Sequence, residues 1–232
     1  MAKKYIVLDT ETTGLEVKAG HRVIEIGAVL VNDRKKSEDH FHTYLNPSRL
    51  IDEEATKVHG INNSDLEDSP SFDEIAEEFI EFIDGATLVI HNAPFDIGFL
   101  NNELQMASSN FPKIEEICEV EDTLLMARSK FPGQRNSLDA LANRFEISGY
   151  DRSFHGALLD ANILADVYIH LTGGQSKFEF IASNINSNFE SETSELNIDL
   201  KKFPIPKIIV SKEDMLANDQ RIAEINSKRD SS

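Results

Sequence analysis

The sequence predicts an α/β domain in which a mixed sheet, including an antiparallel meander, is flanked by helices and followed by a flexible C-terminal tail. Three strand-like segments follow one another within residues 5–45. Beyond them, a further short apolar strand and several segments of helical periodicity continue to residue 171. After residue 173 the chain becomes rich in Ser, Asn, Glu and Thr and poor in apolar residues, which is typical of a linker.

The first strand lies within YIVLDTETTG, residues 5–14, whose short apolar run predicts a strand buried on both faces. Side chains two apart on a strand point the same way, so Asp9 and Glu11 present two carboxylates side by side. Like charges this close require a cation, and carboxylate oxygens suit Mg²⁺ or Mn²⁺ better than Zn²⁺. A strand that ends in a solvated acidic turn is the alternative interpretation of these residues alone.

Two further strand-like runs, residues 22–31 and 40–45, complete the predicted meander. The charged segment between them, residues 33–39, predicts a hairpin connection. A polar stretch begins at residue 52 and includes Glu54 and the loop VHGI, for which no strand or helix is predicted.

Helical periodicity dominates the remainder of the domain. A short apolar strand, residues 86–90, leads into a helix whose first turn holds Pro94 and Asp96. His155 stands just before the last helix, which carries Asp160. The predicted helices cover residues 71–83, 94–106, 122–130, 137–145 and 156–171.

These acidic residues and the histidine form a candidate catalytic site. Asp9, Glu11 and Asp96 follow the carboxyl ends of strands, where ligands bind in open α/β sheets. His155 precedes Asp160 by five residues, so both can face one cleft. Four carboxylates with two divalent cations would form a phosphoryl-transfer site, and a neutral imidazole suits a general base. Taken singly, Asp96 also fits a helix-start acid, Asp160 a solvated helix residue and His155 a cap.

Three motifs carry a resemblance to a known family. DTETTG, HNAPFD and HGALLDA, in this order, resemble the three motifs of the DEDDh 3′→5′ exonucleases. EIGAV, VHGI and FPGQRNSLDAL extend the similarity to the proofreading epsilon subunits of bacterial DNA polymerase III, over nearly all of residues 3–176. The resemblance implies a ribonuclease-H-like fold and, as a subunit of a DNA-directed DNA polymerase, hydrolysis of mispaired 3′ ends of DNA to 5′-mononucleotides.

The resemblance also implies roles for individual residues. His155 would be the general base, and Glu54 and His59 match positions that contact the terminal nucleotide. Four carboxylates are the implied ligands of two divalent cations, Mg²⁺ or Mn²⁺: Asp9, Glu11, Asp160 and Asp96. The first three would also face the substrate, and Asp96 would act directly or through water.

The tail has a resemblance of its own. Gln175, Phe178 and Phe180, in QSKFEF, resemble a sliding-clamp-binding peptide, although a linker with two chance phenylalanines is an alternative. Some relatives also carry a small accessory subunit. We therefore expect three parts: an exonuclease domain at 1–173, a clamp-binding motif and flexible linker at 174–202, and a segment that binds the polymerase catalytic (alpha) subunit at 203–232.

Composition limits the remaining possibilities. With 41 acidic and 23 basic residues the net charge is −18, whereas a freestanding nucleic-acid binder usually has a basic face. DNA would therefore be bound through metal ions and with the help of a partner. A single cysteine and no long apolar run predict a cytoplasmic protein without membrane contact. An RNA-trimming exonuclease and a subunit that mainly bridges polymerase and clamp are the alternative functions.

Overall fold

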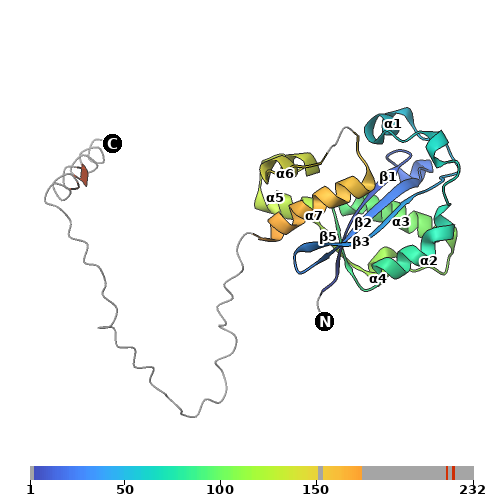
Figure 1. The fold of residues 1–232 in the computed structure, drawn as a ribbon, viewed down its shortest axis with the longest axis horizontal. Helices are drawn as coiled ribbons and strands as arrows, with labels where there is room; N and C mark the ends of the chain where they lie inside the picture. Colours follow the sequence, from blue (N-terminus) through green and yellow to red (C-terminus); the bar gives the residue numbers. More distant parts are fainter. Residues whose placement is uncertain (1–2, 151–153, 174–217, 219–220, 223–232) are drawn as a thin grey trace, which may run out of the picture. The chain divides into compact units, whose positions relative to one another are not determined.

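The computed structural model describes residues 3–150 and 154–173, together with residues 218, 221 and 222. Its centre is a five-stranded mixed sheet with the strand order β3-β2-β1-β4-β5 (Figure 1). The first three strands pair antiparallel, whereas β4 runs parallel to β1 and β5 parallel to β4. The strands are β1 (Tyr5–Thr12), β2 (Val23–Asn32), β3 (Lys35–Tyr44), β4 (Thr87–Ile90) and β5 (Glu119–Asp122). The predicted meander within a mixed sheet is confirmed.

Helices cover both faces of this sheet (Figure 1). One face packs against α2 (Phe72–Ile83), α3 (Ala93–Ala107) and α4 (Ile114–Ile117). The other packs against α5 (Thr123–Lys130), α6 (Leu138–Arg144) and α7 (Ala157–Gly173). The 3-10 turn η1 (Val17–Ala19) lies between β1 and β2. Helix α1 (Glu53–His59) and the 3-10 turn η2 (Asn63–Leu66) lie between β3 and α2. Within the described ranges, no helix combines the length and apolarity needed to cross a membrane.

The central strand β1 directs alternate side chains into the two halves of the core. Ile6 and Leu8 belong to the apolar cluster with α2 and α3, whereas Val7 belongs to the cluster with α7. All three are fully buried, as the uninterrupted apolar run predicts. Because the alternation continues along the strand, Asp9 and Glu11 point to the α7 side of the sheet.

The start of α7 lies unusually close to β2. A Cβ atom on Gly27 would overlap the backbone of Ala157 and Leu158. Gly27 is also the residue paired with Asp9 across the β1–β2 ladder. The missing side chain therefore allows the first turn of α7 to approach the sheet beside the acidic end of β1.

Several boundaries differ from the sequence prediction. The connection between β2 and β3 is only Asp33 and Arg34, both at positive φ, so β3 begins at Lys35 instead of residue 40. Positive φ at both central residues is the requirement of a tight two-residue hairpin. The short elements α1, α4 and β5 were not predicted, because α1 has little apolar periodicity, α4 has only four residues and β5 reads EVED. The five predicted helices are all present, with ends that differ by at most two residues.

Helix α7 ends at Gly173, where the predicted exonuclease domain ends. The predicted clamp-binding residues Gln175, Phe178 and Phe180 lie outside the described residues, as does most of the predicted polymerase-binding segment 203–232. The three described residues of that segment are helical and exposed: Asn218, Arg221 and Ile222. The division of the tail into two functional parts stays a prediction.

Candidate active site

Three of the predicted catalytic side chains meet at the carboxyl end of β1. Ligand atoms of Glu11, His155 and Asp160 all lie within 4.8 Å of one another. The imidazole Nδ1 of His155 lies 2.9 Å from the carboxylate Oδ2 of Asp160. This spacing allows the carboxylates to share one divalent cation, with the imidazole beside it.

The beginning of α7 positions two of these groups. Asp160 lies in its first turn, where its N–H donates to the carbonyl of Gly156 at 2.8 Å, and the residue is only 4% exposed. The backbone N–H of His155 donates to the carbonyl of Val58 at 3.1 Å, which ties this residue to the end of α1. The imidazole is 39% exposed, so water can reach the histidine while the neighbouring carboxylate stays buried.

Asp9 lies two residues before Glu11 on the same side of β1. It is partly buried, and its backbone pairs with Gly27 of β2, over which the start of α7 lies. The structure thus places Asp9 on the face of the sheet from which Asp160 approaches.

Asp96 reaches the same end of β1 from α3. Its residue is 3% exposed, and Thr10 Oγ1, which lies between Asp9 and Glu11 in sequence, donates a hydrogen bond to its Oδ1 at 2.7 Å. Burial raises the pKa of Asp96 to about 7, while the hydrogen bond from Thr10 opposes this shift. A nearby cation would favour the ionised carboxylate and lower this pKa again.

Helix α1 contributes the predicted nucleotide-contacting residues. Glu54 and His59 line a cleft of about 480 Å³ that also includes Glu11. His59 is buried, its Nδ1 accepts a hydrogen bond from the N–H of Ile61 at 3.0 Å, and burial lowers the pKa of its imidazole. A backbone N–H thus holds one ring nitrogen of His59 within the cleft that also includes Glu11.

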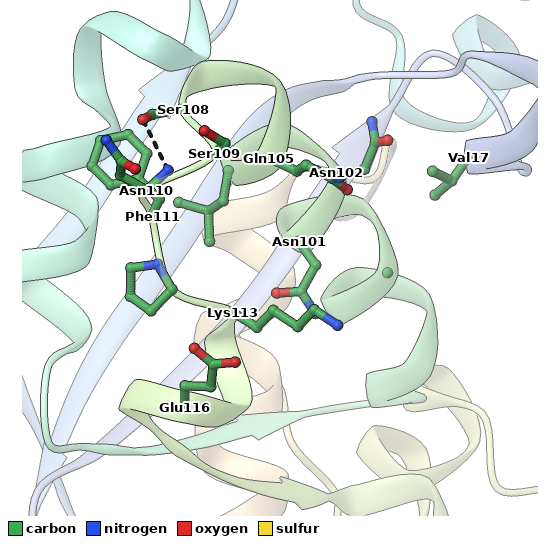
Figure 2. Close-up of a pocket in the computed structure, with 13 residues that line it drawn as sticks. Val17, Asn101, Asn102, Gln105, Ser108, Ser109, Asn110, Phe111, Lys113 and Glu116 are labelled. Atoms are coloured by element: carbon green, nitrogen blue, oxygen red, sulfur yellow. Dashed lines mark hydrogen bonds between the residues drawn. The ribbon is translucent and has the colours of Figure 1, made fainter.

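A different cavity, of about 770 Å³, lies between α3 and the segment that leads to α4 (Figure 2). Asn101, Asn102 and Gln105 of α3 face it, opposite the polar segment 108–113 (Figure 2). None of the predicted catalytic or nucleotide-contacting residues lines it. The larger of these two cavities therefore holds none of the predicted site residues, whereas the smaller one holds Glu11, Glu54 and His59.

Sequence reasoning missed Glu25, a residue that directly supports the site. It is 3% exposed and lies opposite Glu11 in the β1–β2 ladder. Its Oε2 accepts a hydrogen bond from the N–H of Ala157 at 3.1 Å, and its Oε1 lies 2.8 Å from Nε2 of His42. The available signal was a lone glutamate within the apolar run VIEIGAV, where a strand interior rarely holds an unpaired charge.

Comparisons with known proteins point to an exonuclease. Residues 6–168 match the family model described as exonuclease. DNA polymerase III subunit epsilon of Escherichia coli (strain K12) is 44% identical over 229 residues, which cover 97% of this chain and 94% of the relative. The subunit of the same name from Rickettsia typhi (strain ATCC VR-144 / Wilmington) is 52% identical over 177 residues, covering 76% of this chain and 77% of the relative.

Solved structures share the fold. Exonuclease X, in complex with 5′ overhanging duplex DNA, is 25% identical with a TM-score of 0.59, over 74% of this chain and 94% of that one. The nuclease domain of 3′hExo, a DEDDh family member bound to rAMP, is 19% identical with a TM-score of 0.62, over 73% and 92% of the two chains. The ribonuclease-H-like exonuclease fold is thereby confirmed. This fold and the extent of the sequence matches together show that the chain belongs to the exonuclease family and, within it, to the DNA polymerase III epsilon subunits.

Proposed function

We propose that this protein is the proofreading 3′→5′ exonuclease subunit of a replicative DNA polymerase and that it releases mispaired 3′-terminal nucleotides as 5′-mononucleotides. The observation that carries the proposal is the meeting of Glu11, His155 and Asp160 at the end of β1. Two carboxylates and an imidazole at this spacing suit metal-assisted hydrolysis of a phosphodiester.

Two divalent cations, Mg²⁺ or Mn²⁺, complete the proposed site. Asp9, Glu11 and Asp160 are the proposed ligands, and Asp96 contributes directly or through water. The donor set fits such ions, because hard carboxylate oxygens surround a place where buried acids would otherwise repel one another. When bound, the cations supply an activated water nucleophile and stabilise the leaving oxygen.

His155 is the proposed general base, which accepts the proton of the attacking water. Its contact with Oδ2 of Asp160 orients the ring, and its partial exposure leaves the imidazole open to water. A neutral imidazole can accept this proton.

The cleft beside α1 is the proposed seat of the terminal nucleotide, with Glu54 and His59 as contacts. Its acidic end, at Glu11, suits the scissile phosphate once cations are bound. An apolar wall suits a nucleobase and provides no base-specific hydrogen bonds, as removal of any mispaired nucleotide requires. The side chains of this wall are Leu15, Ala55, Val58 and Phe95.

The proposed partners follow from the tail and the charge. Residues 203–232 are proposed to bind the polymerase catalytic (alpha) subunit, and Gln175, Phe178 and Phe180 the sliding clamp, in the cytoplasm. A small accessory subunit is a further proposed partner. The net charge of −18 favours a role in which the partners, instead of this chain, hold most of the DNA.

Primer digestion tests the catalytic part of the proposal. The purified protein should shorten a 3′-mismatched or single-stranded DNA primer with Mg²⁺ or Mn²⁺ and stop when EDTA removes the metal. A matched RNA oligonucleotide should be degraded more slowly, and the reverse preference would favour the RNA-trimming alternative. Full activity of Asp9→Ala would refute the assignment of the site.

A further inference from the structure

Glu25 is a buried carboxylate that connects three elements. It lies on β2, and its side chain is 3% exposed, so water cannot satisfy its charge. One oxygen accepts the N–H of Ala157 at the start of α7, and the other pairs with Nε2 of His42 on β3. A buried carboxylate is tolerated only when such partners are held in place.

The start of α7 takes a hydrogen-bond acceptor from another element, the strand β2. The residue before Ala157 is Gly156, which has no side chain to accept the free N–H groups of the first turn. Glu25 supplies an acceptor from the neighbouring strand, and its negative charge lies at the positive end of the helix dipole. Gly156 itself lies over this carboxylate, since a Cβ there would be 3.8 Å from Oε2 of Glu25.

This contact bears directly on the geometry of the catalytic groups. Asp160 lies in the turn that Glu25 holds, and His155 immediately precedes that turn. Glu25 lies opposite Glu11 in the β1–β2 ladder. The hydrogen bond that Ala157 N–H donates to Glu25 therefore ties the first turn of α7 to β2, the strand that pairs with β1 at Glu11.

We propose that Glu25, oriented by His42, is a positioning residue of the exonuclease. Through the N–H of Ala157 it fixes the first turn of α7, so that Asp160 and His155 meet Glu11 before any cation or DNA binds. The proposal rests on the proposed function of the site, but Glu25 itself touches neither substrate nor metal in this role.

Two substitutions of the full-length protein separate position from charge. Glu25→Ala removes the acceptor for the Ala157 N–H, whereas Glu25→Gln keeps an amide oxygen in its place. Three quantities are measured below the melting temperature: exchange of the Ala157 amide hydrogen in metal-free protein, the Kd for Mn²⁺ without DNA, and kcat and KM on a single-stranded oligonucleotide.

The expected results differ between the two variants. Glu25→Ala should exchange the Ala157 amide about 10-fold faster and weaken Mn²⁺ binding and kcat by about 10- to 100-fold, with KM for DNA unchanged, as when the outer support of a metal ligand is lost. Glu25→Gln should stay within about threefold of the wild type in all three quantities, because the hydrogen bond is preserved. If Glu25→Ala does not fold, His42→Ala replaces it and should shift the same quantities in the same direction.

Glu103 provides a matched control. It is 1% exposed and accepts hydrogen bonds from the N–H of Val23 in β2, at 3.0 Å, and from the guanidinium of Arg22. It belongs to α3, however, which packs on the face of the sheet opposite α7. Glu103→Gln should lower the melting temperature without changing Ala157 exchange or the Kd for Mn²⁺.

Two outcomes would overturn the positioning role: wild-type exchange and Mn²⁺ affinity in folded Glu25→Ala, or an equal loss of both in Glu103→Gln. Failure of the proposed function looks different. In that case the wild-type protein is inert on DNA, while amide exchange and Mn²⁺ binding still depend on Glu25.

Discussion

Replacing Gly27 with alanine should separate α7 from the catalytic end of β1. The added carbon would lie closer than 3.0 Å to backbone atoms of Ala157 and Leu158, where ordinary contacts are 3.4–4 Å. Backbone atoms cannot rotate aside as a flexible side chain can, so the start of α7 must retreat by on the order of 1 Å.

The displacement should cost both stability and rate. Overpacking of this kind destabilises a protein by about 1–3 kcal/mol. The larger effect is on catalysis, because Asp160 and His155 move with α7 whereas Glu11 stays with the sheet. A misplacement of about 1 Å between catalytic groups lowers kcat by on the order of 10²-fold.

Thermal denaturation measures the loss of stability. Primer digestion, at a temperature where both the variant and the wild type are folded, measures the loss of rate. Gly98→Ala is the matched control, since a Cβ at Gly98 in α3 meets nothing within 4 Å. It should keep the wild-type rate and gain about 0.5–1 kcal/mol of stability, as a helical glycine replaced by alanine does. A folded Gly27→Ala protein with a rate within about threefold of the wild type would refute the argument.

Three further predictions concern the catalytic groups and the tail. His155→Ala should lower kcat by about 10²- to 10⁴-fold while the protein still binds Mn²⁺, and titration calorimetry measures that binding. An equal loss of kcat and of Mn²⁺ affinity would instead make the imidazole a metal ligand. Burial raises the pKa of Asp96 to about 7, whereas the pKa of this carboxyl in the unfolded chain is near 3.8. The metal-free protein should therefore lose stability progressively as the pH rises from about 4 to about 7, because the folded state resists ionisation of Asp96. Asp96→Asn should therefore melt higher than the wild type at about pH 8 in EDTA and equally at about pH 3, and a difference of the opposite sign would contradict the pKa shift. Removal of residues 174–232 should leave digestion of single-stranded DNA intact and abolish co-purification with the polymerase catalytic subunit, whereas an inert truncated domain would favour the bridging role.

The sequence predicted those parts of the site that depend on local pattern. Asp9 and Glu11 follow directly from period-two alternation after an apolar run, and Asp160 follows from its place in the first turn of a strongly apolar helix. The proximity of His155 to Glu11 needed the fold, and the similarity of the motifs provided it.

What the sequence left out depends on contacts across the sheet. Glu25 became interpretable only when α7 was seen to begin over β2, because nothing within VIEIGAV indicates which helix its carboxylate caps. The early start of β3 was missed because KKSEDH is charged, as an exposed edge strand tolerates, and the alternation signal requires a buried face. The raised pKa of Asp96 also depends on tertiary burial that no local pattern contains.

The direction of α7 has a consequence for how the enzyme can be tethered. From Asp160 to Gly173 the helix advances about 20 Å at 1.5 Å per residue, and β1 spans a similar length between Tyr5 and Glu11 at about 3.3 Å per residue. Tyr5 and Gly173, the far ends of these two elements, therefore both lie about 20 Å from the proposed catalytic groups. A tag fused at either position would be attached at that distance from them.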